Sequence, residues 1–264
     1  RILAMLLVIA SCLSLAVSAS AAGTTTRKAA DFKDYDRTAW YAEAVSAAVD
    51  NGLLYGKSAT VIDPNGDMTR AEMAAIINRS FGCYKTTDIS QYKDVSKSKW
   101  YYKDVALAVQ MGTYNGRSAS AMAPDAPISR QEAMTVVARA LELDYDSYSK
   151  TDLSAFSDRS EISNWALPYV RAMIGADYIH GRGKVLAPLE NITRAEFAQI
   201  FYNIIGTYIV SKGTYVKDIK GSALIRTDEV TLQNMTVDGD LIIGCGAADG
   251  KITLDNVTVK GRLL

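Results

Sequence analysis

Hydrophobic residues recur with a helical period in segments that come in three pairs along the chain. Apolar positions spaced three or four residues apart predict amphipathic helices. The first segments carry their stripes at Tyr41, Val45, Ala48 and Val49, at Val105, Ala108 and Val109, and at Val170, Met173 and Ile174. The second segments carry theirs at Met73, Ile76, Ile77 and Phe81, at Met134, Val137 and Leu141, and at Phe197, Ile200, Phe201, Ile204 and Ile205. The pattern predicts a mainly α protein.

Each second helix is expected to begin with the same four-residue motif. Its copies are Thr69-Arg70-Ala71-Glu72, Ser129-Arg130-Gln131-Glu132 and Thr193-Arg194-Ala195-Glu196. A hydroxyl residue followed three positions later by Glu forms a capping box, in which each side chain accepts a backbone N–H at the other position. The Arg is unexplained by this, because a cation at a helix start opposes the helix dipole. We therefore expect a compensating partner for each motif Arg.

The helix pairs belong to three copies of one unit, spanning residues 31–82, 92–141 and 156–206. Arg130 follows Arg70 by 60 residues, and Arg194 follows Arg130 by 64 residues. Each unit reads as helix, glycine-stopped loop, helix. One helix pair cannot bury its own apolar stripe, so the units are expected to share a core. A pseudo-threefold bundle and an open solenoid both satisfy this requirement.

After Gly206 the pattern changes to a β period. Residues 230–241 and 252–263 match position for position at an offset of 22 residues, with Asn234 and Asn256 at matching places. Alternating β-formers with a repeated Asn predict the first coils of a parallel β-helix over residues 214–264. Because two coils cannot bury a continuous core, we expect the protein to continue beyond Leu264.

Residues 1–22 are typical of an export signal. One Arg precedes an apolar run from Ile2 to Val17, and small residues suited to a cleavage site follow. The run is short for a membrane span. We expect a secreted protein without stable membrane insertion after cleavage; a retained anchor is the alternative.

Charge and cysteine content exclude several classes of partner. Lys plus Arg and Asp plus Glu both number 29, so the net charge is zero and no basic tract predicts nucleic-acid binding. Cys12 lies in the signal, and the separated Cys83 and Cys245 do not form a disulfide scaffold. With His180 as the sole histidine, neither a zinc site nor a catalytic triad can be assigned. We predict no metal, no cofactor and no enzymatic activity.

The three units resemble the S-layer homology (SLH) family. The resemblance rests on the aromatic-x-Asp segments ending at Asp34, Asp94 and Asp158, on the Gly and Pro of the loops, on the motif itself, and on Trp40, Trp100 and Trp165, each 29 or 30 residues before the motif Arg. It implies a trimer-like bundle that binds secondary cell-wall polysaccharide, often pyruvylated, and holds an exported protein on a Gram-positive-type wall. Self-assembly in a surface layer is a further possibility. The third copy lacks the aliphatic residue after Asp158.

The motif arginines are the leading candidates for ligand binding. A carboxylate suits a helix N-terminus, where free N–H groups point outward, and an adjacent guanidinium can hold both carboxylate oxygens. Arg70, Arg130 and Arg194 are therefore predicted to bind the anionic sugar. The competing interpretation is a salt bridge from each Arg to a neighbouring unit's Asp. Both interpretations can be correct if each Arg pairs with the Asp until a ligand displaces it.

A glycine followed by a basic residue recurs in each loop, as Gly56-Lys57, Gly116-Arg117 and Gly181-Arg182. We call the three basic residues the loop bases. The repetition predicts that these residues border the ligand groove, with the glycines allowing close approach of a sugar. The alternative is that the loops are simply polar.

Two further repeated positions have competing roles. For Asp34, Asp94 and Asp158, helix capping or loop bracing is favoured over a ligand contact. For Trp40, Trp100 and Trp165, packing in the core is favoured over stacking on sugars. His180, beside Gly181, is read as a surface or groove residue.

The leading hypothesis is a non-enzymatic wall-anchoring module. Its rivals are a wall-anchored polysaccharide lyase or hydrolase whose catalytic β-helix lies mostly beyond Leu264, and repeats that serve only self-assembly.

Overall fold

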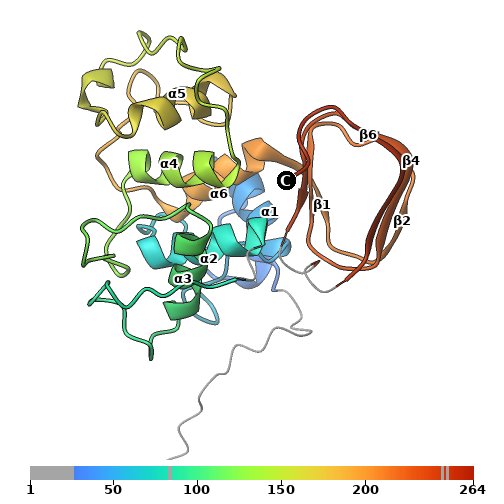
Figure 1. The fold of residues 1–264 in the computed structure, drawn as a ribbon, viewed down its shortest axis with the longest axis horizontal. Helices are drawn as coiled ribbons and strands as arrows, with labels where there is room; N and C mark the ends of the chain where they lie inside the picture. Colours follow the sequence, from blue (N-terminus) through green and yellow to red (C-terminus); the bar gives the residue numbers. More distant parts are fainter. Residues whose placement is uncertain (1–26, 83–84, 245–246, 248–249) are drawn as a thin grey trace, which may run out of the picture.

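The computed structural model describes residues 27–82, 85–244, 247 and 250–264 (Figure 1). The predicted export signal and all three cysteines lie outside these residues. Six α-helices form in the described part: α1 Ala42–Asp50, α2 Arg70–Phe81, α3 Tyr102–Gln110, α4 Arg130–Ala140, α5 Leu167–Gly175 and α6 Arg194–Ile204. Short 3-10 helices span Ala29–Asp31 and Arg159–Glu161. Within the described residues, no helix combines the length and apolar character needed to cross a membrane.

Helices α2, α4 and α6 begin at the motif Arg, as the capping boxes predict. The Glu72 N–H donates to Thr69 Oγ1 over 3.2 Å, and the Thr69 N–H donates to Glu72 Oε2 over 3.1 Å. The same reciprocal bonds start α4 and α6. Ser129 in place of Thr therefore leaves the cap intact.

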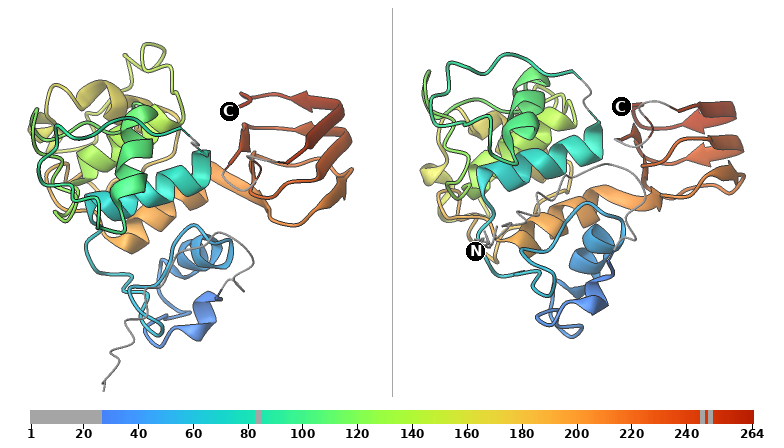
Figure 2. Two further views of the ribbon diagram at one scale, coloured as in Figure 1. Left: turned by 60° about the horizontal axis from the view of Figure 1, so that its bottom comes forward. Right: turned by 90° about the horizontal axis from the view of Figure 1, so that it is seen from below.

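The most extensive helix pairings run across the repeats. Helix α3 packs against α2, α5 against α4, and α1 against α6 (Figure 2). The first helix of each repeat thus covers the second helix of the preceding repeat, and the third repeat is covered by the first. This cyclic pairing makes a closed pseudo-threefold bundle and excludes the open solenoid.

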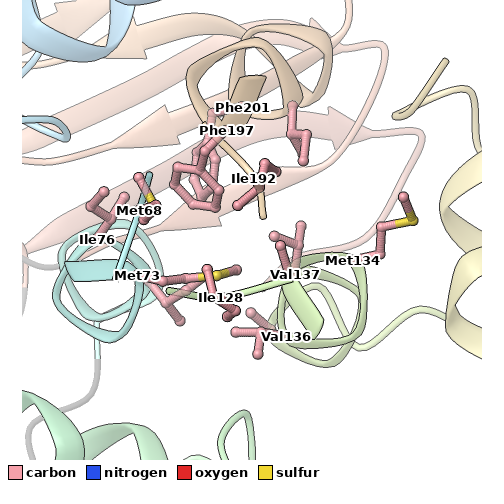
Figure 3. Close-up of a cluster of buried hydrophobic side chains, with 14 of the residues drawn as sticks. Met68, Met73, Ile76, Ile128, Met134, Val136, Val137, Ile192, Phe197 and Phe201 are labelled. Atoms are coloured by element: carbon pink, nitrogen blue, oxygen red, sulfur yellow. The ribbon is translucent and has the colours of Figure 1, made fainter. Parts of the chain in front are cut away.

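A ring of backbone hydrogen bonds closes the bundle where the three motifs begin. The N–H of Met68 donates to the carbonyl of Ile192, Ile192 donates to Ile128, and Ile128 donates to Met68, each over 3.0 Å. Their fully buried side chains lie in one cluster with residues of α2, α4 and α6 (Figure 3). Each repeat contributes one third of this centre.

The C-terminal part forms two small parallel sheets. Their strands are β1 Ile205–Ile209, β2 Gly213–Tyr215, β3 Ser222–Ile225, β4 Val230–Val237, β5 Leu241–Ile243 and β6 Ile252–Val259. One sheet has the order β1-β3-β5 and the other β2-β4-β6. Val230 pairs with Ile252, which is the predicted offset of 22 residues.

The sheets begin directly at the end of the third repeat. Strand β1 starts at Ile205, immediately after α6 and before residue 214, where the pattern placed the β region. Leu224 and Ile242 belong to the same buried cluster as the helices. Arg226 and Arg262 also donate to the carbonyls of Asn51 and Leu141 in the bundle. The β region therefore packs against the bundle without an intervening linker.

Candidate functional site: three grooves between the repeats

Three grooves of matching composition lie at the boundaries between repeats. We call them groove A, about 280 Å³, groove B, about 340 Å³, and groove C, about 500 Å³. Each has a loop Gly, a loop base, a motif Glu, a Trp and a motif Arg in its lining. Groove A has Gly56, Lys57, Glu72, Trp100 and Arg194; groove B has Gly116, Arg117, Glu132, Trp165 and Arg70; groove C has Gly181, Arg182, Glu196, Trp40 and Arg130.

Every groove is assembled from all three repeats. In groove A the first repeat supplies Lys57 and Glu72, the second supplies Trp100 and the third supplies Arg194. The cross-repeat helix pairing explains this, because each Trp precedes a first helix that packs on the previous repeat. No single repeat contains a complete groove.

The tryptophans are exposed, so the prediction of core packing is wrong. Trp40, Trp100 and Trp165 are 64%, 62% and 51% exposed. The residue after each Trp, at the position just before the first helix, is buried instead: Tyr41, Tyr101 and Ala166. Trp40 and Trp100 meet the following Tyr edge to face, with ring centroids 5.6 and 5.4 Å apart. The buried neighbour anchors the chain and leaves the indole facing the groove.

The motif arginines are almost completely buried, with exposures of 2% to 5%. Arg70 Nη1 lies 2.9 Å from Glu132 Oε1, while its Nε and Nη2 donate to the carbonyls of Met122 and Asn115 over 2.9 and 2.8 Å. Arg130 pairs in the same way with Glu196 at 2.9 Å, and Arg194 with Glu72 at 3.5 Å. The predicted intramolecular partner exists, but it is the next repeat's motif Glu and not an Asp.

The helix N-termini are also closed, which corrects the expectation of free N–H groups. The N–H of Arg70 donates to the Ala126 carbonyl over 3.0 Å, and that of Ala71 to the Pro124 carbonyl over 2.9 Å. The third N–H of the helix is taken by the Thr69 cap. Helices α4 and α6 are closed identically by the neighbouring repeat. The cation at the helix start is thus offset by a carboxylate, and an anion cannot reach these N–H groups.

The loop bases bind the same carboxylates from the outer side. Lys57 Nζ lies 2.5 Å from Glu72 Oε1, Arg117 Nη2 lies 3.2 Å from Glu132 Oε2, and Arg182 Nε lies 2.6 Å from Glu196 Oε1. Their side chains are 33% to 43% exposed. Each motif Glu therefore holds one buried and one accessible cation, so that in each groove lining these two cations meet one carboxylate.

This arrangement shifts the pKa values of the carboxylates. Burial raises the pKa of Glu132, but hydrogen bonds from the Ser129 N–H and Arg117, with the charge of Arg70, outweigh it and hold the pKa below its usual value. Glu196 has a lowered pKa for the same reasons. Burial lowers the pKa of Arg130 and Arg194, while the paired Glu opposes the shift.

The aromatic residue of each aromatic-x-Asp segment packs directly against the loop glycine of its repeat. A Cβ on Gly56 would lie 2.4 Å from the Phe32 ring and 2.7 Å from the Ser58 carbonyl oxygen. Gly116 and Gly181 have the same relation to Tyr92 and Phe156. The absence of a side chain is therefore required by packing within the loop, whatever approaches from outside.

The aspartates brace the loops, as the favoured interpretation predicts. Asp34 accepts the N–H groups of Ile62 and Asp63 over 2.9 and 2.7 Å. Asp63 has a left-handed backbone with φ of 55°, as do Ala123 and Ala187, which are held equally by Asp94 and Asp158. None of these three aspartates is among the described residues that line the grooves.

The grooves differ at one position on the second helix. Nine residues after the motif Arg stand Arg79 in groove A, Arg139 in groove B and Asn203 in groove C. The linings of grooves A and B thus each contain three Lys or Arg side chains and one carboxylate, whereas the lining of groove C contains two Arg side chains and one carboxylate. In groove C the loop base Arg182 is also shared with Glu190, at 2.5 Å. His180 lines groove C, as a groove contact requires.

Comparison with known sequences identifies the family. The model of the S-layer homology domain matches residues 31–74, 91–134 and 155–198, the repeats that enclose the three grooves. The chain belongs to the S-layer homology domain family.

Relatives include a surface-layer protein and two enzymes. A surface-layer 125 kDa protein of Lysinibacillus sphaericus is 34% identical over 66% of this chain and 15% of its own length. An amylopullulanase of Thermoanaerobacterium thermosulfurigenes is 29% identical over 70% of this chain and 11% of its own length. An endoglucanase of Bacillus sp. (strain KSM-635) is 26% identical over 77% of this chain and 22% of its own length. The chain thus spans less than a quarter of each of these relatives.

Proposed function

We propose that grooves A, B and C bind an anionic secondary cell-wall polysaccharide and thereby hold an exported protein on a Gram-positive-type wall. The observation that carries this proposal is the repeated pairing of an exposed Trp with surplus cations in one groove. An exposed indole offers an apolar face on which a sugar ring can stack.

The cationic surplus suits an acidic sugar, such as one carrying a pyruvate ketal. Lys57, Arg117 and Arg182 are the accessible donors, and each can turn from its Glu toward a ligand carboxylate. The buried Arg70, Arg130 and Arg194 keep the Glu paired when this happens. The motif arginines then contribute to the groove's field and shape, while the loop bases make the contact.

Three weak sites on one bundle can retain a polymer firmly if the polymer spans more than one of them. This supports non-covalent anchoring at the cell surface, consistent with relatives that include a surface-layer protein and an amylopullulanase.

The proposal is tested with purified cell-wall sacculi and the triple variant Trp40→Ala, Trp100→Ala, Trp165→Ala. We expect the variant to stay in the supernatant while the unchanged protein sediments with the sacculi. Tyr145→Ala, an exposed aromatic outside the grooves, serves as the matched control. Equal sedimentation of the triple variant and the unchanged protein would overturn the assignment.

A second arm identifies the ligand chemistry. Removing pyruvate from the sacculi is expected to weaken binding, because the loop bases lose their anion. Unchanged binding after this treatment would exclude pyruvate as the recognised group, and binding to polymer-stripped walls would favour self-assembly.

We further propose that residues 31–206 are non-catalytic. An enzyme joined to them is the second candidate, favoured by relatives such as the amylopullulanase and the endoglucanase. Release of reducing or unsaturated ends from wall polysaccharide by the purified chain would show an enzymatic activity within it, and no release would support the non-catalytic proposal for residues 31–206.

For the C-terminal part we propose the first coils of a parallel β-helix. The odd-numbered strands form one parallel sheet and the even-numbered strands form the other. This is expected if each successive coil adds one strand to each sheet. Asn234 and Asn256 both have left-handed backbone, and Asn256 Nδ2 donates to Asn234 Oδ1 over 2.8 Å. Asn256→Val is expected to destabilise this region, because a β-branched residue resists positive φ; an unchanged hydrogen-exchange pattern in β4 and β6 would contradict the stacked-coil proposal.

A further inference from the structure

The third repeat departs from the other two at the residue after its bracing Asp. Arg159 stands there, where the first two repeats have Tyr35 and Val95. Both of those face inward: Val95 is buried, and Tyr35 packs against the core and donates its hydroxyl to the Ala42 carbonyl over 2.8 Å. Arg159 is exposed. This substitution therefore moves a side chain from the core to the surface.

A second departure lies on α5. Arg171 stands six residues after Trp165, whereas the equivalent positions after Trp40 and Trp100 are Ser46 and Ala106. Both departures introduce an arginine, and both are confined to the third repeat.

The two arginines meet in one pocket of about 540 Å³, which we call the α5 pocket. It lies between α5 and the connector of residues 149–154, and it shares no lining residue with grooves A, B and C. The connector adds Lys150 and the polar residues Ser149, Thr151 and Ser154 to its lining. Its size is in the range of ligand pockets, about 300–1,000 Å³.

Arg171 lacks the partners that a guanidinium normally has. Its Nε is buried and has no hydrogen-bond partner among the described residues, and no ion pair joins it to them. An unsatisfied buried donor is unfavourable, and a charged one more so. Arg159 uses one donor, Nη1, on the Phe156 carbonyl at 3.2 Å, and a guanidinium has five. The pocket therefore holds unused donors.

The charge balance of the α5 pocket also favours an anion. Lys150, Arg159 and Arg171 face one carboxylate, Asp152. That carboxylate is engaged by its own turn, because it accepts the Ser154 N–H over 2.8 Å and the Ser154 hydroxyl over 2.7 Å. Two positive charges are left without a counterpart in the pocket.

We propose that the α5 pocket binds an oxyanion, a phosphate or a carboxylate carried on a polar group, with Arg171 and Arg159 as its donors. This site is separate from the proposed wall-binding grooves and does not depend on them.

The test uses the full chain, titrated separately with inorganic phosphate and with pyruvate while the Arg Nε–H resonances are followed by NMR. We expect a saturable shift of the Arg171 Nε–H resonance with at least one of the two anions. The anion that binds more tightly identifies phosphate or carboxylate as the ligand group. Arg171→Ser, which carries the first repeat's residue, is expected to weaken binding at least about tenfold, as the loss of a charge-assisted hydrogen bond implies.

Because that variant removes the reporting group, its affinity is measured by calorimetry. Arg159→Tyr, again the first repeat's residue, should also weaken binding. Lys57→Ser alters groove A and should leave the Arg171 shift unchanged. The proposal is overturned if neither anion gives a saturable shift, or if Arg171→Ser binds as tightly as the unchanged chain. Failure of the grooves to bind glycan would leave these results intact.

Discussion

At the scale of single residues, the two arginines on Glu132 show how one carboxylate serves both the fold and the groove. Arg70 reaches it from the first repeat and is 5% exposed at the side chain; Arg117 reaches it from its own repeat and is 43% exposed. Breaking a buried pair leaves an uncompensated charge, whereas an exposed pair is screened by water. The two substitutions should therefore differ sharply.

We predict that Arg70→Met lowers the free energy of unfolding by about 3–5 kcal/mol, because Glu132 and two loop carbonyls lose their donor. Arg117→Met is the matched control and should cost less than about 1 kcal/mol. Urea denaturation followed by circular dichroism measures both. Equal losses from the two variants would contradict the division of roles.

The lowered pKa values of Glu132 and Glu196 predict acid sensitivity. When the folded-state pKa lies below the unfolded value, the carboxylate stabilises the fold above the unfolded value of 4.5, and this contribution is lost as pH falls through the folded pKa. The melting temperature should therefore fall as pH is lowered below about 5. Glu132→Gln should be less stable at pH 7, and its melting temperature should fall less steeply as the pH is lowered. If the melting temperatures of the variant and the unchanged protein fall in parallel, Glu132 is not a source of the acid sensitivity.

At the scale of elements, each loop is shaped by contacts that come from outside it. The aromatic-x-Asp segment places its ring on the loop Gly and its carboxylate on two consecutive N–H groups, the second of them in left-handed backbone. The carbonyls of the same loop then cap the helix of another repeat. The loop that carries the base is thus rigidly placed.

Asp94→Ala tests this bracing. The N–H groups of Met122 and Ala123 lose their acceptor, so we predict a loss of about 1–3 kcal/mol in the free energy of unfolding. Asp88→Ala removes an exposed Asp whose hydrogen bonds to the described residues stay within its own turn, at Ser90, and it should change stability by less than about 0.5 kcal/mol. Thermal denaturation distinguishes them, and indistinguishable melting curves would count against bracing.

At the scale of the whole molecule, the bundle is closed by contacts that need all three repeats. The backbone ring at Met68, Ile128 and Ile192 needs all three repeats, and so does every groove. This differs from a solenoid, in which each repeat contacts only its neighbours.

We predict that deleting residues 83–141 abolishes sacculus binding and cooperative unfolding together. The deletion removes Trp100 from groove A, the body of groove B and Arg130 from groove C. Trp100→Ala, which alters groove A alone, should keep part of the binding and an unchanged melting transition. If the variant that lacks residues 83–141 keeps two-thirds of the sacculus binding of the unchanged protein, the repeats act independently.

The sequence by itself determined the helices, the residues at which the motif helices begin, and the three repeats. These follow from interactions between residues close in the chain, namely the helical period and the capping box, and repetition made each signal clear. It also indicated the parallel β pattern, through the offset between matching strands.

Only the tertiary structure decided what the repeated positions face. A one-residue difference separates the buried Tyr41 from the exposed Trp40, and an aromatic residue that lies beside an apolar stripe can take either place. The pairing of Arg70 with Glu132 spans 62 residues and depends on which repeat covers which helix. Cross-repeat contacts have no local signature, because identical motifs look the same whether their partners lie within a repeat or in the next one.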